Sequence, residues 1–323
     1  MVAATPSGGI HVVAAVDIGS NTIKMSIARQ AEANANGFEE LASGSHTVRL
    51  GAGLAETGRL ADDRIASALE TLTAFAGEAR RHGATRLVGV ATAATRQAAN
   101  GPEFLASVAN ETGWDVRVVS GDEEAALTFR GLASEHDLSG IVVVADIGGG
   151  STEVIVAEHE VIRSSQSLPL GSGALTERFV VSDPPATAEL DACATAAIDA
   201  LTVIDWPAAG GRAHLIVVGG TAEAVAKLLP PKAPVTRTAI EQAIATCRDL
   251  SSTELSDRFE LPPARARVLP AGLTIIAELA RMVAPDRISL ARSAIRSGLL
   301  LATFDDLRAQ TSAPTSPSSS GGD

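Results

Sequence analysis

Apolar and polar positions along the chain follow two periods, and segments with one period alternate with segments that have the other. Residues 12–18 (VVAAVDI) and 22–28 (TIKMSIA) are short apolar-rich runs separated by a glycine turn, and the second run alternates strictly between apolar and polar positions. Such runs are typical of β-strands. In residues 62–82 the apolar side chains instead recur every three or four positions, and Gly83 follows. This spacing predicts a helix that ends at a glycine cap.

The same alternation continues through the next 150 residues. We predict strands at 86–91, 115–119, 141–147, 153–158 and 214–218, and helices at 102–112, 122–132 and 222–229. Strands that alternate with helices in this way favour an α/β fold.

The chain contains an internal duplication. The segment VDIGSNTIKMSIA (16–28) aligns without a gap on ADIGGGSTEVIVA (145–157), at an offset of 129 residues. Asp17 then falls on Asp146, and Lys24 falls on Glu153. A repeated strand–turn–strand unit predicts two similarly built α/β lobes that face one cleft. We expect a division near residue 135, with one lobe at 10–134 and the other at 135–309, and we expect the last helix to pack back on the first lobe.

Composition and charge exclude several classes of protein. Apolar residues make up 46% of the 323 residues and charged residues 20%, which is typical of a globular protein. Two cysteines exclude a disulfide scaffold, and we expect no signal peptide, no membrane span and a cytoplasmic location. The net charge of −12 disfavours binding to nucleic acid or to an anionic membrane. The ends, residues 1–9 and 310–323, have compositions that predict flexible tails.

One region departs from the acidic average. Residues 258–304 hold seven arginines against three acids, so this segment is either a solvated helical surface or an anion-binding surface. Its arginines are Arg258, Arg265, Arg267, Arg281, Arg287, Arg292 and Arg296.

Three glycine turns are the candidate phosphate-binding elements. Backbone N–H groups in such turns form anion-binding nests, and small hydroxyls beside them add donors. Other phosphate signatures, such as the P-loop and the dinucleotide-binding glycine motif, do not occur. The candidate phosphate-binding residues are Gly19, Ser20, Asn21, Thr22 and Lys24 around the first turn, Gly148, Gly149, Gly150, Ser151 and Thr152 in the second, and Gly219, Gly220 and Thr221 in the third.

Two glutamates are the candidate catalytic residues. Glu124 lies in the acidic start of a predicted helix, where acids also stabilise the helix dipole, whereas Glu153 lies on the strand that leaves the second glycine turn. A carboxylate beside bound phosphate is unfavourable unless it holds Mg²⁺ or takes a proton from an attacking water. Hydrolysis of a phosphoanhydride needs both functions.

The sequence of motifs resembles the exopolyphosphatase / guanosine pentaphosphate phosphohydrolase family, which shares its fold with actin, the Hsp70 chaperones and sugar kinases. The matching segments run in family order from about residue 12 to residue 300, and they are AAVDIGSNTIKMSIA, VRLGAGLAETGRL, VATAATRQAANG, VVSGDEEAALTFRG, VVVADIGGGSTEVIVA, SLPLGSGALTERF, VVGGTAEAVA and VLPAG. The resemblance implies that Glu124 and Glu153 are the catalytic pair, that Arg96 binds phosphate, and that Asp17, Asp146 and Glu153 hold Mg²⁺ or Mn²⁺. It also implies two actin-like lobes.

Two positions differ from the family pattern. Relatives commonly have His or Arg where this chain has Lys24, and lysine keeps the charge but lacks the bidentate fork of arginine. Relatives also have an acid where this chain has Ser297. The additional helical domains of longer relatives are not present in this sequence, so we expect a short phosphate-gripping surface and a preference for short chains.

The resemblance leaves four functions open. The first is Mg²⁺-dependent release of terminal orthophosphate from inorganic polyphosphate, and the second is hydrolysis of guanosine pentaphosphate (pppGpp). The third is a kinase of the shared fold, and the fourth is a non-catalytic sensor of polyphosphate or of the alarmones pppGpp and ppGpp. We favour the first, and we expect a cytoplasmic homodimer that binds neither nucleic acid nor membranes.

Overall fold

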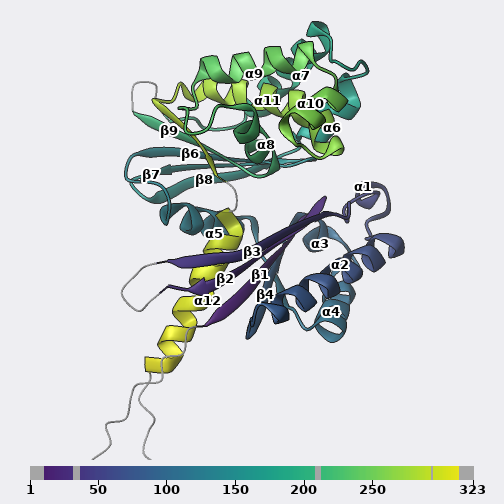
Figure 1. The fold of residues 1–323 in the computed structure, drawn as a ribbon, viewed down its shortest axis with the longest axis vertical. Coiled ribbons are helices and arrows are strands. Elements are labelled where there is room, and N and C mark those ends of the chain that lie inside the picture. The colour runs from purple at the N-terminus through teal and green to yellow at the C-terminus, as the bar shows by residue number, and fades with distance from the viewer. Residues whose placement is uncertain (1–10, 32–36, 208–211, 292–293, 313–323) are drawn as a thin grey trace, which may run out of the picture.

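The protein is built from two five-stranded sheets, which a computed structural model describes over residues 11–31, 37–207, 212–291 and 294–312 (Figure 1). The predicted tail at 1–9 and residues 313–323 of the predicted C-terminal tail lie outside the described residues. The prediction was wrong for residues 310–312, which continue the last helix.

The first sheet has the strand order β3-β2-β1-β4-β5. Its strands are β1 (Val12–Ile18), β2 (Thr22–Gln30), β3 (Phe38–Thr47), β4 (Arg86–Ala91) and β5 (Asp115–Val118). Two helices cover one face of it, α2 (Asp62–Arg81) and α4 (Gly101–Thr112), while the short helices α1 (Leu54–Thr57) and α3 (Ala93–Gln97) lie in the connections. The predicted helix at 62–82 therefore forms as expected, and its apolar stripe packs on the sheet.

The second sheet repeats this order as β8-β7-β6-β9-β10. Its strands are β6 (Ile141–Ile147), β7 (Thr152–Glu158), β8 (Val161–Leu168), β9 (Ala213–Val218) and β10 (Arg287–Ala291). The helices of this lobe are α6 (Ser172–Phe179), α7 (Thr187–Leu201), α8 (Gly220–Leu228), α9 (Arg237–Asp249), α10 (Ser252–Phe259) and α11 (Pro263–Val283). Helix α11 is the most deeply buried of these and forms the centre of the largest apolar cluster.

The internal duplication extends into details of the sheets that the sequence comparison did not reach. In each lobe the second and third strands are antiparallel, and a bulge interrupts their register, between Ile27 and Ala28 in β2 and between Val156 and Ala157 in β7. These two bulges are separated by the same offset of 129 residues. The third strand of each unit, β3 and β8, was not predicted from the sequence. Both lobes thus repeat one topology and one set of local irregularities.

The two remaining helices are exchanged between the lobes. Helix α5 (Gly121–Ala133) follows the first sheet but packs its apolar residues, such as Phe129 and Leu132, on the second sheet. Helix α12 (Ala294–Ser312) follows the second sheet and packs Leu300 and Phe304 on the first. The last helix therefore does pack on the first lobe, and α5 makes the reciprocal contact with the second lobe.

The exchanged helices cross at two glycines. A Cβ atom at Gly131 in α5 would overlap the carbonyl oxygen of Ala294, and a Cβ atom at Gly298 in α12 would overlap the carbonyl oxygen of Leu127. Only glycine permits so close an approach of two helix backbones. This crossing brings the start of α5 to the space between the lobes (Figure 1).

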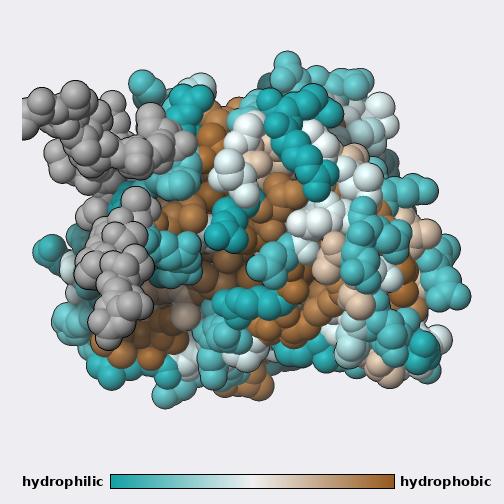
Figure 2. Space-filling view, turned by 90° about the horizontal axis from the view of Figure 1, so that it is seen from below, coloured by the Kyte–Doolittle hydropathy of each residue, from teal (hydrophilic) through white to brown (hydrophobic). Residues whose placement is uncertain are grey.

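Seen from below, the molecule shows an extensive apolar area near the centre of this face (Figure 2). On the first lobe, the partly buried Phe38 and Val88 pack against the cluster that contains Phe304. Within the described residues, no helix combines the length and the apolar character that crossing a membrane would require.

Candidate functional site

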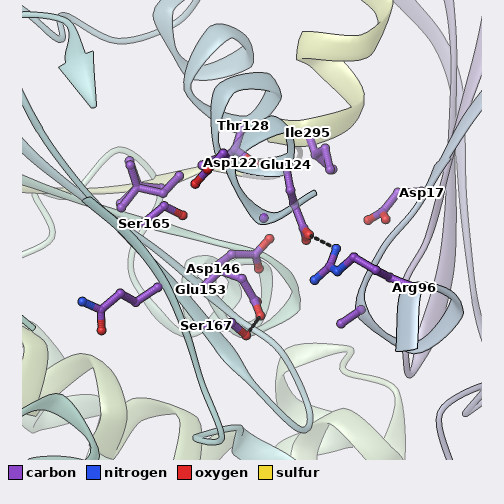
Figure 3. A pocket seen from close by; sticks show the side chains of 16 residues that line it. Asp17, Arg96, Asp122, Glu124, Thr128, Asp146, Glu153, Ser165, Ser167 and Ile295 are labelled. Carbon is purple, nitrogen blue, oxygen red and sulfur yellow. Dashed lines mark hydrogen bonds and ion pairs between the residues drawn. The ribbon is translucent and has the colours of Figure 1, made fainter. Parts of the chain in front are cut away.

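A cavity of about 100 Å³ lies between the two lobes, and all four acidic candidates line it. Asp17 and Arg96 reach it from the first lobe, Glu124 from α5, and Asp146 and Glu153 from the second lobe (Figure 3). The other residues that line it are Ala93, Gly121, Asp122, Ala125, Thr128, Val144, Ile155, Ser165, Gln166, Ser167 and Ile295. The structure therefore brings together five residues that the sequence placed up to 136 positions apart.

The first glycine turn is fixed by backbone hydrogen bonds to its carbonyl groups. The N–H groups of Val48 and Arg49 donate to the Asn21 carbonyl at 3.0 and 2.8 Å, and the Gly51 N–H donates to the Ser20 carbonyl at 2.8 Å. These bonds satisfy acceptors that would otherwise repel an anion. The turn can then present N–H groups to a phosphate.

The second turn is fixed in the same way by the start of α6. The Ser172 N–H donates to the Gly148 carbonyl and the Ala174 N–H donates to the Gly149 carbonyl, both at 2.9 Å. A Cβ atom at Gly171 would overlap the Gly149 carbonyl, so glycine is required there. The two lobes thus use different segments to produce the same arrangement.

The first two turns face each other across the cleft, and the third supports the second. The side-chain nitrogen of Asn21 lies 3.3 Å from the position of a Cβ atom built on Gly149. Gly219 has a φ angle of 90°, and a Cβ atom there would overlap a carboxylate oxygen of Asp146. The third turn is therefore packed against Asp146. The residues that line the cavity include none of the three glycine turns and not Lys24, so the turns lie beside the cavity and not in its wall.

A helix cap directs Glu124 into the cavity. Ser120 caps α5 by accepting from the Glu123 N–H, and the Glu123 side chain accepts from the Ser120 N–H, so that Glu123 has a structural role. Glu124, one residue later, faces the cavity with 21% of its side chain exposed. The acidic start of α5 therefore combines a capping residue and a candidate catalytic residue.

Arg96 links α3 to this glutamate. Its Nη1 donates to the Val119 carbonyl at 2.6 Å and lies 3.6 Å from Glu124 Oε2 (Figure 3). Because the backbone carbonyl holds the guanidinium in place, Arg96 can contact both Glu124 and a ligand in the cavity.

Asp146, Glu153 and Ser167 form a row across the second sheet, which we call the C-terminal row. Asp146 is directly opposite Glu153 in the β6–β7 register, and Glu153 is directly opposite Ser167 in the β7–β8 register. Residues that are directly opposite in antiparallel strands share a face. Ser167 Oγ donates to Glu153 Oε1 at 2.8 Å (Figure 3).

Asp17, Lys24 and Ser45 form the equivalent row across the first sheet, which we call the N-terminal row. Asp17 is opposite Lys24 in the β1–β2 register, and Lys24 is opposite Ser45 in the β2–β3 register. The buried Arg296 of α12 lies behind this row and donates from Nε to Ser26 Oγ at 3.0 Å. Lys24 and Arg296 both oppose the effect of burial, which raises the pKa of Asp17.

Burial among other acids raises the pKa of both candidate catalytic glutamates. Burial, with the nearby carboxylates of Glu153 and Asp17, raises the pKa of Glu124 to about 8 despite Arg96. Burial, with the Asp146 carboxylate, raises the pKa of Glu153 to about 7, although hydrogen bonds from serines act in the opposite direction. Two interacting groups with pKa values near neutral are typical of acid–base sites.

Some of the predicted phosphate-binding side chains are turned away from the cavity. Thr152 is fully buried and its hydroxyl donates to the Leu170 carbonyl, while the buried Thr221 hydroxyl donates to the Ile147 carbonyl. Each hydroxyl proton is therefore used in a hydrogen bond within the protein and is not available to a ligand. These two threonines can therefore contribute at most through the backbone.

Sequence reasoning missed the contribution of β8, since Ser165, Gln166 and Ser167 all line the cavity. The local sequence carries little signal for this strand, because the segment 161–168 is polar, its alternation is weak, and the duplicated segments end before it.

The acidic side chains do not form a ready-made metal site. Within the described residues, no group of three His, Cys, Asp or Glu side chains is close enough to hold a metal ion. The carboxylates of Asp146 and Glu153 are neighbours, and oxygen ligands are the type that Mg²⁺ prefers. The donor set therefore fits a hydrated Mg²⁺ whose remaining ligands come from water and substrate phosphate.

The arginines of 258–304 do not act as one surface. Arg267 donates to the carbonyl groups of Ser182 and Val180 at 2.8 and 2.9 Å, which ties α11 to the segment after α6. Arg265 lies against Gly220 in the third glycine turn, and burial lowers its pKa. Arg292 lies outside the described residues.

Two lobes of the same topology, with an acid-lined cavity between them, define the actin-like ATPase fold. The Ppx/GppA phosphatase family model matches residues 26–307, and the chain belongs to this family. A solved structure of an Aquifex aeolicus Ppx/GppA family member superposes with a TM-score of 0.76 and 28% identity, covering 93% of this chain and 99% of that one. The fold and family expected from the sequence are thus confirmed.

Two curated relatives have different names. A protein of Mycobacterium tuberculosis named exopolyphosphatase 2 is 40% identical over 185 residues, which are 55% of this chain and 58% of that protein. A guanosine-5'-triphosphate,3'-diphosphate pyrophosphatase of Vibrio atlanticus is 29% identical over 309 residues, which are 91% of this chain and 60% of that protein. The matches span about three fifths of the length of either relative.

Proposed function

We propose that this chain hydrolyses the terminal phosphoanhydride bond of inorganic polyphosphate and releases orthophosphate. The observation that carries the proposal is the convergence of Glu124 and Glu153, from different elements, on one cavity beside two facing glycine turns. The name of the Mycobacterium tuberculosis relative supports polyphosphate as the substrate.

In this reaction a water oxygen attacks the terminal phosphorus, and the bond to the bridging oxygen breaks as the shorter phosphate chain leaves. Glu124 takes the proton from the attacking water in its ionised form, which Arg96, 3.6 Å from the carboxylate, favours by lowering its pKa. Glu153 orients the same water from the opposite side of the cavity. Arg96 also offsets the negative charge that develops on the transferred phosphoryl group.

The glycine turns bind the phosphate chain through their N–H groups. Ser20 and Asn21 act from the first lobe, and Gly149 to Ser151 act from the second, while Lys24 supplies a positive charge beside the first turn. This role is supported by the hydrogen bonds that tie the turn carbonyls to the protein behind them.

A divalent cation, Mg²⁺ or Mn²⁺, fits beside Asp146 and Glu153, with Asp17 on the other side of the cleft. When bound, it neutralises phosphate charge and lowers the pKa of a coordinated water. Without a bound cation, the carboxylates that line the cavity would repel polyphosphate, and the net charge of −12 of the whole chain adds to this repulsion.

Hydrolysis of pppGpp is a second candidate function, since the name of the Vibrio atlanticus relative points to this substrate and that match covers 91% of this chain. Phosphate release from tripolyphosphate, from longer polyphosphate and from pppGpp should be measured in parallel with Mg²⁺ and with Mn²⁺. Polyphosphate hydrolysis predicts the largest kcat/KM for a polyphosphate. A sensor would bind either compound without releasing phosphate, and a kinase would consume ATP only with an acceptor.

We also propose that the protein acts as a cytoplasmic homodimer, as the sequence analysis expects. Light scattering coupled to size-exclusion chromatography tests the mass directly. A monomer at all concentrations up to the micromolar range would contradict the dimer and leave the catalytic proposal unaffected.

A further inference from the structure

Ser167 is the only residue of the C-terminal row that is not acidic, and it contacts the candidate catalytic carboxylate. It lies on β8 at the edge of the second sheet, directly opposite Glu153. Its hydroxyl oxygen is 2.8 Å from Glu153 Oε1. A serine hydroxyl has one proton to donate, and a carboxylate only accepts, so the direction of this bond is determined when Glu153 is ionised.

The hydrogen bond between Ser167 and Glu153 contributes little to the stability of the folded protein. Ser167 is an exposed residue on an edge strand, and a solvent-accessible hydrogen bond contributes little net stability because water can replace it. The register of β8 is already specified by its backbone pairing with β7 from Thr152 to Glu158. The position of the hydroxyl therefore matters more to Glu153 than to the sheet.

The bond restricts what the carboxylate of Glu153 can do. Ser167 holds Oε1, and Ser151 also hydrogen-bonds this carboxylate, so the two serines together fix the carboxylate plane on the strand. Without the Ser167 hydroxyl, the carboxylate is held on the Ser151 side alone, and a glutamate with three rotatable bonds beside the like-charged Asp146 gains the freedom to turn.

We propose that Ser167 is a positioning residue that holds the Glu153 carboxylate in the orientation needed to align the attacking water. The inference rests on the proposed hydrolytic function for its catalytic readout. Ser167 does not itself bind phosphate in this proposal; it acts through Glu153.

The N-terminal row supplies a matched control. Ser45 occupies the equivalent edge-strand position, but its neighbour is Lys24, which has no oxygen to receive a hydroxyl proton. Ser45→Ala is the same chemical change on the same kind of exposed edge strand. It should leave kcat, KM and the melting temperature at their wild-type values.

The kinetic experiment compares Ser167→Ala, Ser167→Thr and Ser45→Ala with tripolyphosphate as substrate. Ser167→Ala should lower kcat about tenfold, which is the effect of losing one hydrogen bond to a charged group, and should change KM by less than about twofold. Ser167→Thr should restore kcat, because it returns the hydroxyl and suits a β-strand. In a Glu153→Gln background, Ser167→Ala should cause no further loss, since both changes affect the same carboxylate.

Two kinetic results would overturn the proposal. One is a Ser167→Ala variant with wild-type kcat. The other is a Ser167→Ala variant that loses the same factor with and without Glu153, because this would mean that Ser167 acts independently.

A structural readout separates this proposal from the proposed function. In crystal structures, Glu153 should keep one side-chain orientation in the wild type and in Ser167→Thr, and should adopt another orientation or several in Ser167→Ala. If Glu153 stays in place in Ser167→Ala, the positioning role is refuted even if the enzyme is active. If the wild type releases no phosphate from any of the substrates, the hydrolytic function fails, and the crystal structures still decide whether Ser167 positions Glu153.

Discussion

The two lobes share a topology, a bulge position and a row of three residues, but they differ in the charge at the centre of that row. The N-terminal row is Asp17, Lys24 and Ser45, and the C-terminal row is Asp146, Glu153 and Ser167. The lysine of one lobe therefore occupies the position of the candidate catalytic glutamate of the other.

In the proposed function, this difference gives the two sides of the cleft different roles. In the first lobe, Lys24 and the buried Arg296 both lower the pKa of Asp17, and we propose that this side accepts phosphate. In the second lobe, Glu153 adds to the charge of Asp146, and its pKa rises to about 7. One duplicated scaffold thus provides a side that can bind an anion and a side that can hold a cation or activate water.

The largest expected effect follows from removing a carboxylate on the second side. Glu124→Gln or Glu153→Gln should lower kcat by about two to four orders of magnitude, which is the contribution of a positioned acid or base. Glu123→Gln is the matched control, because Glu123 caps α5 and is not among the residues that line the cavity. Phosphate-release kinetics with either polyphosphate or pppGpp provides the measurement, and near-wild-type turnover in a cavity variant would reassign the base.

The next effect concerns the exchanged helices that join the lobes. Gly298→Ala should destabilise the protein by about 1–3 kcal/mol, the usual cost of overpacking, because the new Cβ atom would overlap the Leu127 carbonyl. Gly121→Ala is the matched control, because Gly121 lies in α5 and has open space around its Cβ position. Gly53→Ala is not suitable, because Gly53 has a φ angle of 74° that alanine rarely adopts. Urea unfolding of Gly298→Ala and Gly121→Ala should therefore separate the two, and equal midpoints would contradict the close crossing.

Replacing Lys24, the central residue of the N-terminal row, should change KM more than kcat. Lys24→Ala should raise KM about tenfold with little change in kcat, because it removes a charge-assisted contact to phosphate. Lys24→Arg keeps the charge and should retain a near-normal KM. An unchanged KM in Lys24→Ala, measured over a range of substrate concentrations, would remove Lys24 from the phosphate-binding set.

Arg265 and Arg267, both in α11 of the second lobe, should behave differently when each is replaced by alanine. Arg265→Ala should raise KM for long polyphosphate more than for tripolyphosphate, by about threefold, and the difference should shrink at high salt as screening increases. Arg267→Ala should instead lower the melting temperature, because Arg267 bonds the carbonyl groups of Ser182 and Val180. If Arg265→Ala leaves the dependence on chain length unchanged, Arg265 packs against the third glycine turn without taking part in polyphosphate binding.

The last prediction is a pH dependence of stability in the absence of metal and substrate. The pKa values of Glu124 and Glu153, about 8 and about 7, lie above the ordinary value of 4.5, so the folded state binds these two protons more tightly than the unfolded chain. This contribution to stability is complete below about pH 4.5 and is lost as the pH rises through 7 and 8. Denaturant unfolding between pH 5 and pH 9 should show this decline, and Glu124→Gln/Glu153→Gln should flatten it.

Much of the candidate site could be predicted from the local sequence. The duplicated segments predicted β1, β2, β6 and β7 within two residues of their bounds, and the aligned acids Asp17 and Asp146 do line one cavity. Glu153 became a candidate because a carboxylate next to a predicted phosphate-binding turn has few structural reasons to be there, and both Glu124 and Glu153 line the cavity. These features depend on periodicity and on turn chemistry, both of which act over a few residues.

Other features depended on contacts between distant segments. The close crossing of α5 and α12 depends on the glycines at 131 and 298, and the local sequence around these two glycines does not show this role. The different surroundings of Arg265 and Arg267 likewise depended on distant segments, because Arg267 reaches the carbonyl groups of Ser182 and Val180 whereas Arg265 lies against Gly220.

The sequence by itself determined the two-lobed α/β fold and the family, because the repeat places similar acids and glycines at the ends of the same strands, and it singled out Glu124 and Glu153 as candidate catalytic residues. Only the tertiary structure decided which hydroxyls face the cavity and how strongly the acids interact. Thr152 and Ser167 show the physical reason: both are small polar residues near the second turn, but one hydroxyl is buried on a carbonyl and the other lies 2.8 Å from Glu153. The direction of a side chain depends on strand register and on packing with distant residues, and neither is visible in the local pattern.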